Sequence, residues 1–114
     1  MKLLIVEDNL GVRLLIRSIA EGMSHQTCEC SDGADALAAY QSNRPDLVLM
    51  DIQMGDVDGI VATQRILAAD PLARVVMVTD YDQLDLREAA TQAGACGYLL
   101  KENLLDLIHL LETF

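Results

Sequence analysis

Acidic side chains stand directly after two short apolar runs of this chain. Glu7 and Asp8 follow the run 3–6, and Asp51 follows the run 47–50. If these runs are neighbouring parallel strands, the three carboxylates converge at one edge of a sheet, where they repel one another unless a cation lies between them. Mg²⁺ prefers a few carboxylate oxygens together with waters and a phosphate. The acidic residues therefore predict a magnesium site.

Two further polar residues follow apolar runs in the second half of the chain. Thr79 follows the run 75–78, and Lys101 follows the run 98–100. A hydroxyl and an ammonium group beside carboxylates and a metal ion supply donors and positive charge that stabilise a transferring phosphoryl group. The set predicts a phosphoryl-transfer environment in which Asp51, alone at the end of its run, is the nucleophile.

The apolar runs indicate strands, and the segments between them have helical spacing. Besides the four runs above, a weaker alternating stretch lies at 26–30. Residues 58–69 predict a helix with Asp58 as its N-cap and a stop at Asp70-Pro71. Two other helical stripes are Val12, Leu15, Ile16 and Ile19, and Ala34, Leu37 and Ala38.

Strands that alternate with helices predict parallel strands joined by crossover helices. Near-continuous apolar strands are typical of a parallel sheet that is covered on both faces. We predict a doubly wound, flavodoxin-like α/β fold, in which a five-stranded parallel sheet of order 2-1-3-4-5 has helices on both faces. The strand order reverses between strands 1 and 3, which carry the acidic residues, and ligands of such folds bind at this reversal.

The composition indicates one acidic domain. The 114 residues, 52% of them hydrophobic, suffice for one core, so we assign residues 1–114 to one domain. Lys and Arg total 8 against 18 Asp and Glu, and the net charge of −10 argues against direct binding to nucleic acid or anionic membranes.

The chain has the features of a protein from a reducing compartment. It has no signal peptide and no apolar run of the roughly 18 residues that span a bilayer, so we expect a cytoplasmic protein. Its cysteines are expected to be free thiols. We interpret Cys28 and Cys30 as core residues of a strand rather than as half of a zinc site.

Five motifs occur along the chain. In order they are LIVEDN at 4–9, LVLMDIQM at 47–54, Asp58-Gly59, Val78-Thr79 and AGACGYLLK at 93–101. Each is modest alone, but together, in this order and spacing, they are highly specific. Over essentially the whole chain the sequence resembles the receiver domain of two-component response regulators, in particular the single-domain chemotaxis regulators.

The resemblance implies a role for each site residue. Asp51 resembles the phosphoacceptor, which takes a phosphoryl group from a sensor histidine kinase or a phosphotransfer protein. Glu7 and Asp8 resemble the acidic pair that holds Mg²⁺ together with the phosphoacceptor. Gln53 stands where the family uses a backbone carbonyl as a metal ligand, and Lys101 resembles the lysine that pairs with the phosphorylated aspartate.

The resemblance also implies a switch. Thr79 resembles the hydroxyl residue that moves to the phosphoryl group, and Tyr98 resembles the aromatic residue that turns inward when it does. That movement would repack the face formed by the fourth helix, the fifth strand and the fifth helix, where a downstream effector protein or an output domain would bind. Such a receiver catalyses its own phosphorylation and dephosphorylation and is not a conventional enzyme.

Four residues depart from the family's pattern. Gly55 and Glu102 stand where proline is usual, so the loops that follow the phosphoacceptor and the lysine are expected to differ, the second because a cis bond is costly without proline. Asp80 stands where a small residue is common and can tune access to the phosphoacceptor. Tyr81 occupies a position that in the family affects the lifetime of the phosphoryl group.

Three other classes of protein share parts of this pattern. A phosphatase of the haloacid-dehalogenase type needs a second aspartate two residues after its nucleophile, where this chain has Gln53. A flavodoxin-like flavin carrier cradles a phosphate in its first loop, which Glu7-Asp8-Asn9 would repel. The third class, a receiver-like interaction module that works without phosphorylation, is the alternative that we retain, although the complete set of site residues argues against it.

The output is not encoded in a module of its own within this sequence. We expect either a single-domain regulator that acts by protein contact or the receiver of a longer regulator. Leu105 and Leu110 lie off the core stripe of the last helix and are candidates for a partner or homodimer face.

Overall fold

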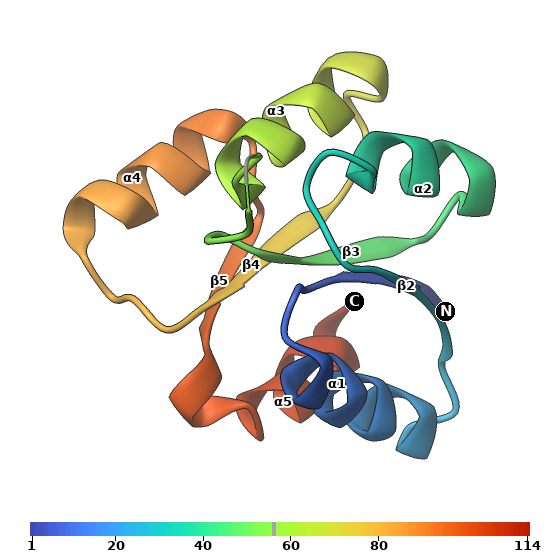
Figure 1. The fold of residues 1–114 in the computed structure, drawn as a ribbon. Coiled ribbons are helices and arrows are strands. Elements are labelled where there is room, and N and C mark those ends of the chain that lie inside the picture. Colours follow the sequence, from blue (N-terminus) through green and yellow to red (C-terminus); the bar gives the residue numbers. More distant parts are fainter. Residues whose placement is uncertain (56) are drawn as a thin grey trace.

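The computed structural model describes residues 1–55 and 57–114, which form a sheet between two layers of helices (Figure 1). The strands are β1 (Lys2–Val6), β2 (Gln26–Cys30), β3 (Leu47–Asp51), β4 (Val75–Thr79) and β5 (Gly97–Leu100). The helices are α1 (Leu10–Gly22), α2 (Ala36–Asn43), α3 (Gly59–Ala69), α4 (Leu84–Ala93) and α5 (Asp106–Thr113), with a short 3₁₀ helix, η1 (Lys101–Asn103), between β5 and α5.

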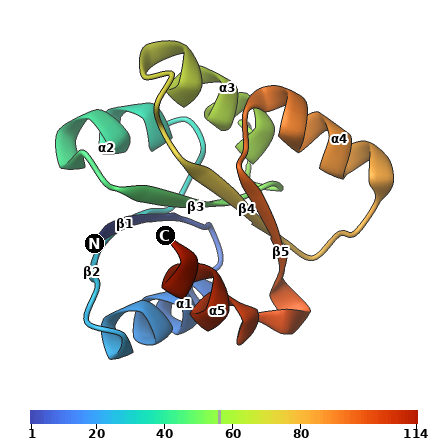
Figure 2. The same cartoon turned by 180° about the vertical axis from the view of Figure 1, so that it is seen from behind.

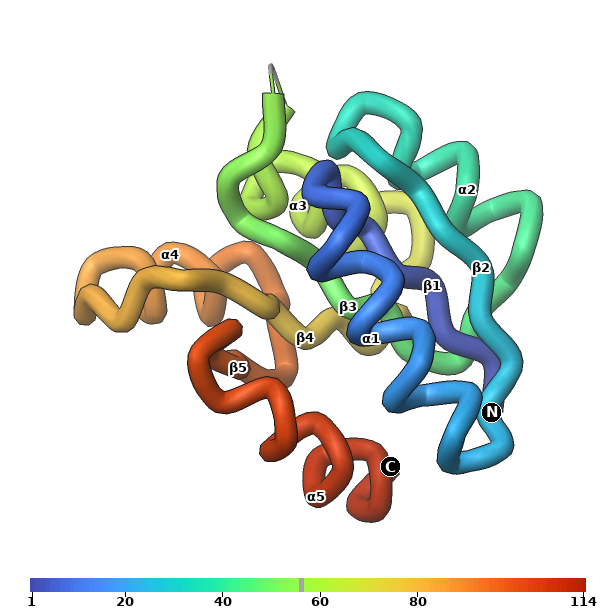
Figure 3. Tube along the Cα trace, turned by 60° about the horizontal axis from the view of Figure 1, so that its bottom comes forward, coloured from blue at the N-terminus to red at the C-terminus, as the bar shows by residue number. Residues whose placement is uncertain are grey.

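The five strands are parallel and lie in the order β2-β1-β3-β4-β5. Helices α2, α3 and α4 cover one face of the sheet, and α1 and α5 cover the other (Figure 1 and Figure 2). Figure 3 turns the second face toward the reader and shows α1 and α5 in front of the strands. The predicted doubly wound fold is therefore confirmed, including the reversal of strand order between β1 and β3.

Each central strand supplies both cores because successive side chains of a strand point to opposite faces. In β1, Leu3 and Ile5 pack under α1 and α5, whereas Leu4 and Val6 pack under α2, α3 and α4. Strands β3 and β4 are buried along their whole length. Burial on both faces explains why these strands are near-continuous apolar runs in the sequence.

Side-chain caps fix the start of two helices next to the carboxyl ends of the strands. The Asn9 side chain accepts a hydrogen bond from the backbone N–H of Val12 at 3.0 Å, which caps α1. The Asp58 side chain accepts one from the N–H of Val61 at 2.9 Å, so the predicted cap of α3 is confirmed, as is its end before Asp70. Each cap satisfies a backbone donor that has no partner within its helix.

Two leucine assignments were wrong. Leu15 is 50% exposed rather than part of the core stripe of α1, whose fully buried positions are Ile16 and Ala20. Leu110, predicted to lie off the core stripe of α5, packs against the core under α1 and α5, whereas Leu105 is 72% exposed, as predicted. Of the two leucines, Leu105 alone remains available to a partner.

The predicted stripe in the second helix was wrong at two of its three positions, although Leu37 packs against the core as predicted. Ala34 precedes α2 and is exposed, as is Ala38, whereas Ala36 and Tyr40 are the buried positions. Alanine is small enough to stand on either face of a helix, so several alanines in succession do not define one. The large ring of Tyr40 determines which face of α2 packs against the sheet.

The cysteines are free and two of them lie on β2. The Cys28 thiol donates to the carbonyl oxygen of Leu3 at 3.4 Å, and the Cys30 thiol donates to that of Asp32 at 3.1 Å. Cys30 is buried and Cys28 half-buried, which agrees with core residues of a strand. Within residues 1–55 and 57–114, no helix is both long and apolar enough to cross a membrane.

Candidate functional site

The carboxyl ends of four strands bring the predicted site residues to one edge of the sheet. Glu7 directly follows β1, Asp51 ends β3, Thr79 ends β4 and Lys101 directly follows β5. Because β1 and β3 are neighbours, the acidic residues of the first motif lie beside Asp51. Sequence positions 94 residues apart, Glu7 and Lys101, are thereby joined by a hydrogen bond.

Three carboxylates and one ammonium group form the centre of the site. Oxygens of Glu7, Asp8 and Asp51 all lie within 4.8 Å of one another. The Nζ of Lys101 lies 2.8 Å from Glu7 Oε1 and 3.2 Å from Asp51 Oδ1, so it bridges the two carboxylates. Glu7 and Asp51 are buried, whereas Asp8 is exposed to solvent. The structure thus brings together the four residues from which the sequence predicted a charged centre.

Burial shifts the proton affinities of these groups. Burial, together with the contact to Asp51, raises the pKa of Glu7 to about 8. Burial also raises the pKa of Asp51, although Glu7 and Lys101 both act to lower it. Burial alone would lower the pKa of Lys101, but the hydrogen bond to Glu7 and the charge of Asp51 outweigh it, and the pKa is raised. Lys101 is therefore a cation, and the two buried acids compete for negative charge.

One oxygen of the centre has no partner within the protein. In the described part of the chain, Glu7 Oε2 is the buried side-chain oxygen or nitrogen that makes no hydrogen bond. A buried carboxylate oxygen without a partner is costly. When all groups are ionised, three carboxylates against one ammonium leave two negative charges, which one divalent cation neutralises. The donor set consists of oxygen atoms alone, as a hard cation such as Mg²⁺ requires.

A cleft of about 540 Å³ opens over the centre. Besides the centre itself, the polar residues Gln53, Asp80 and Glu102 line the cleft, and all three are exposed. The cleft is therefore strongly acidic. Its apolar wall includes Leu15, whose exposure the predicted core stripe did not account for. Gln53 thus lies at the cleft, and its backbone carbonyl stays a predicted metal ligand.

Thr79 and Tyr98 both form hydrogen bonds with the backbone of Tyr81. Thr79 is buried, and its Oγ1 accepts a hydrogen bond from the backbone N–H of Tyr81 at 3.3 Å. The Tyr98 hydroxyl donates to the carbonyl oxygen of the same Tyr81 at 2.6 Å. The guanidinium of Arg87 lies 4.4 Å from the centre of the Tyr98 ring and also pairs with Asp82. The two predicted switch residues thus hold opposite ends of one residue's backbone.

The four residues that depart from the family's pattern lie in the loops that surround the site. Gly55 has a φ of +38°, a left-handed conformation that glycine adopts without strain. Glu102 lies in η1, and the described residues contain no cis peptide bond, so the loop after β5 is a trans 3₁₀ turn. Asp80 and Tyr81 both line the cleft.

Two residues with a close relation to the centre were not predicted as site residues. A Cβ on Gly59 would lie 1.9 Å from the carbonyl oxygen of Asp51, so glycine is required where α3 begins. The Arg13 guanidinium donates to the carbonyl oxygen of Glu7 at 2.8 Å. A signal for Arg13 exists: it lies three positions before Ile16 on the buried side of α1, where an unpaired cation is costly.

Comparison with known proteins agrees with this geometry. The model of the response regulator receiver domain family matches residues 3–112. Sporulation initiation phosphotransferase F of Bacillus subtilis is 34% identical over 107 residues, which cover 94% of this chain and 86% of that protein. The crystal structure of a LuxR-family two-component response regulator from Aurantimonas sp. SI85-9A1 is 29% identical, with a TM-score of 0.91 over 98% of this chain and 82% of that one.

A third similarity concerns the fold alone. The CheX–CheY–BeF3–Mg²⁺ complex from Borrelia burgdorferi contains a chain that is 23% identical, with a TM-score of 0.88 over 98% of this chain and 89% of that one. Together, the matched family, the sequence identity to a curated relative over most of both chains and the shared architecture lead to one conclusion. This chain belongs to the family of response regulator receiver domains of two-component systems.

Proposed function

We propose that Asp51 accepts a phosphoryl group from a sensor histidine kinase or a phosphotransfer protein and that the phosphorylated chain presents an altered face to its partner. One observation carries the proposal: Asp51 lies among the carboxylates of Glu7 and Asp8 and within 3.2 Å of Lys101 Nζ, at the floor of an open cleft. Receiver domains interact with such phosphodonors and with effector proteins, and this chain belongs to that family.

We propose Mg²⁺ as the cofactor, held by Glu7, Asp8, Asp51 and the backbone carbonyl of Gln53. Receiver domains bind Mg²⁺ at an acidic pocket, and the Borrelia complex with this fold contains Mg²⁺. In this chain, the partnerless Glu7 Oε2 and the convergence of three carboxyl groups support the assignment. When bound, the ion would neutralise carboxylate charge and that of the phosphoryl oxygens.

The residues of this chain would divide the remaining tasks. An oxygen of the Asp51 carboxylate forms the new O–P bond while the P–N bond to the donor histidine breaks, and the released imidazole takes a proton. Lys101 would then pair with a phosphoryl oxygen and keep its contact with Glu7. Hydrolysis of the acyl phosphate regenerates the carboxylate. The aspartate is consumed once per transfer, so the domain is a phosphoacceptor with self-catalysis and not a conventional enzyme.

The bonds to Tyr81 support a route from the phosphoryl group to the surface. If the Thr79 hydroxyl turns toward a phosphoryl oxygen, it releases the N–H of Tyr81, whose carbonyl holds the Tyr98 hydroxyl. Tyr98 would then leave its place beneath Arg87 and turn inward. Because Tyr98 belongs to β5 and Arg87 to α4, the change would alter the α4–β5–α5 face.

We propose that this face binds a downstream effector, an output domain or a second copy of the chain. Two exposed leucines stand at the starts of its helices: Leu84 begins α4 and is 71% exposed, and Leu105 directly precedes α5 and is 72% exposed. Action in the cytoplasm is supported by the free thiols of the chain. The net charge of −10 supports contact with a protein rather than directly with nucleic acid or an anionic membrane.

Phosphorylation with acetyl phosphate tests the proposal. Intact-mass spectrometry is expected to show one added phosphoryl group on the wild type when Mg²⁺ is present and much less when it is chelated. Asp51→Asn is expected to gain none, whereas Asp35→Asn, which replaces an exposed aspartate whose side chain caps no helix, is expected to behave as wild type. Equal labelling of Asp51→Asn, or labelling that is indifferent to Mg²⁺, would contradict the assignment. Absence of labelling in the wild type would favour the phosphorylation-independent interaction module.

A further inference from the structure

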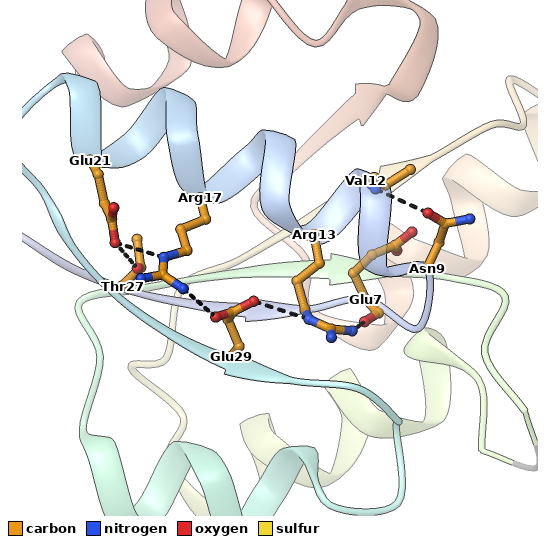
Figure 4. A network of polar contacts seen from close by, with 8 residues as sticks. All are labelled: Glu7, Asn9, Val12, Arg13, Arg17, Glu21, Thr27 and Glu29. Carbon is orange, nitrogen blue, oxygen red and sulfur yellow. Dashed lines mark hydrogen bonds and ion pairs between the residues drawn. The ribbon is translucent and has the colours of Figure 1, made fainter.

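Arg13 of α1 reaches two neighbouring strands at the edge of the site (Figure 4). Its Nη1 donates to the carbonyl oxygen of Glu7 at 2.8 Å, and its Nε donates to Glu29 Oε1 of β2 at 3.0 Å. The Arg13 side chain is only 16% exposed. These contacts use the planar fork of the guanidinium, in which two donors point to different acceptors. Arg13 therefore ties the end of β1 to both α1 and β2.

The carbonyl that Arg13 binds lies just beyond the paired part of β1. Val6 is the last residue of β1 that pairs with β2 and with β3. The N–H of Glu7 still donates to the carbonyl oxygen of Cys30 at 3.0 Å, but the peptide that joins Glu7 to Asp8 is outside the ladder. Arg13 supplies the hydrogen bond that a neighbouring strand supplies elsewhere. The orientation of that peptide determines where the Glu7 and Asp8 side chains point.

A second cation of α1 provides a natural comparison. Arg17, one turn after Arg13, pairs with Glu21 at 2.9 Å and with Glu29 at 3.2 Å. Its side chain is 45% exposed, and its pair with Glu29 joins α1 to β2, as that of Arg13 does (Figure 4). Arg17 makes no hydrogen bond to Glu7. Comparison of Arg13 with Arg17 therefore distinguishes a general role in holding α1 to the sheet from a specific role at the end of β1.

We infer that Arg13 is a positioning residue of the magnesium site: it fixes the Glu7–Asp8 peptide so that the two carboxylates converge with that of Asp51. This inference rests on the proposed function, because it assumes that the three acids hold Mg²⁺. Glu29 takes part indirectly, since it orients the guanidinium from the opposite side.

The sign of one measurement separates positioning from simple electrostatics. Arg13 is a cation close to a site for a cation, so its removal by Coulomb's law alone would tighten Mg²⁺ binding. If Arg13 instead holds the acidic pair in place, its removal weakens binding, because the peptide gains freedom that Mg²⁺ must then remove. A purely structural role predicts equal effects of Arg13 and Arg17 on the affinity.

Calorimetric titration with Mg²⁺ tests the inference on the full chain. We expect Arg13→Ala to weaken Mg²⁺ binding by about tenfold, the low end of the loss seen when outer contacts of metal ligands are removed. Arg17→Ala is expected to stay within about twofold of wild type, as befits an exposed ion pair. Arg13→Lys, which keeps the charge and can still donate to the Glu7 carbonyl, is expected to recover part of the loss. Glu29→Gln keeps Arg13 but weakens the ion pair that orients it, so we expect this variant to lose less Mg²⁺ affinity than Arg13→Ala. It serves as the test if Arg13→Ala does not fold.

A second measurement needs no metal. The ¹⁵N relaxation order parameter of Asp8 in the metal-free protein is expected to fall in Arg13→Ala and to stay unchanged in Arg17→Ala. Equal or tighter Mg²⁺ binding by Arg13→Ala, equal weakening by Arg17→Ala, or an unchanged order parameter would each overturn the inference. If wild type itself does not bind Mg²⁺, the proposed metal site fails, and so does the inference. If wild type binds Mg²⁺ but Arg13→Ala matches it, the proposed function stands and the inference alone fails.

Discussion

Replacement of Gly59 by alanine should lower the stability of this domain and disturb Asp51, the proposed phosphoacceptor. Gly59 is the first residue of α3, and its N–H donates to the carbonyl oxygen of Ile52 at 2.6 Å. An added Cβ would lie 1.9 Å from the carbonyl oxygen of Asp51, 2.8 Å from its carbonyl carbon and 2.9 Å from the Cα of Ile52. Helix α3 therefore starts against the backbone of Asp51.

The size of the effect follows from the nature of the colliding atoms. A Cβ and an oxygen need about 3.4 Å, so roughly 1.5 Å of backbone movement is required, and close packing leaves little room for it. No flexible side chain can move instead, because all three atoms belong to the backbone. Overpacking costs about 1–3 kcal/mol, and we expect a loss near 3 kcal/mol for Gly59→Ala. A loss of this size lowers Tm by more than about 10 °C in a domain of about 100 residues.

Urea unfolding followed by far-ultraviolet circular dichroism measures the loss, with Gly22→Ala as the matched control. Gly22 is also helical, but its Cβ would meet nothing within 4 Å, so alanine is expected to stabilise the protein by about 0.5–1 kcal/mol. Folded Gly59→Ala is further expected to accept phosphoryl groups from acetyl phosphate more slowly, because the end of β3 has moved. A Gly59→Ala protein as stable as wild type would refute the argument that α3 is packed against the backbone of Asp51.

Three more predictions follow from single contacts. Burial raises the pKa of Glu7 from 4.5 to about 8, so the free energy of unfolding falls as the pH rises from about 4.5 to 8. In the metal-free protein the urea midpoint should therefore fall over this pH range, and it should fall less in Glu7→Gln. Asp58→Ala should cost about 1 kcal/mol through loss of the α3 cap, whereas Asp35→Ala, which removes no side-chain cap bond, should change the Tm little. Arg87→Ala removes the cation over the Tyr98 ring, worth about 0.5–1 kcal/mol, and should raise the inward population of that ring about two- to fivefold; unchanged ring chemical shifts would contradict this.

The fold could be predicted from the sequence because the strands are buried on both faces. Runs such as 47–50 and 75–78 have no polar alternation, and a parallel sheet between helices is the arrangement that hides them. The structure extends both runs by one polar residue, to Asp51 and Thr79. The strand ends therefore shift by one residue, and in both strands this residue is a predicted site residue.

Helix faces were harder to predict because small or isolated apolar residues do not identify a face. Leu15 fits the helical spacing of α1, yet it is half exposed and borders the cleft rather than the core. In α2 the alanines fit two stripes equally well, and Tyr40 decides between them. Periodicity counts apolar residues, whereas packing depends on their volume.

The sequence predicted which polar residues lie near one another at the edge of the sheet, but not which of them form hydrogen bonds or ion pairs. The sequence placed Lys101 on the same edge as the acids, but it did not show that Nζ bridges Glu7 and Asp51. Nor did it show that Tyr81 links Thr79 to Tyr98, because both bonds use its backbone, which any residue would provide. Hydrogen bonds to the backbone leave no trace in residue type.

Buried polar residues carry more information about the site than the apolar pattern does. In the described residues four polar side chains are buried: Glu7, Asp51, Thr79 and Thr63. The two acids at the ends of β1 and β3 share one ion-pair partner, Lys101, which follows β5, and one oxygen of Glu7 has no protein partner at all. The two threonines each have a simple hydrogen bond instead: Thr79 accepts from the N–H two residues further along the chain, and Thr63 donates to a methionine sulfur at 3.6 Å inside the core. Burial of a carboxyl group whose partners are distant or missing therefore points to a function, since a fold gains no stability from leaving a polar oxygen buried and unpaired.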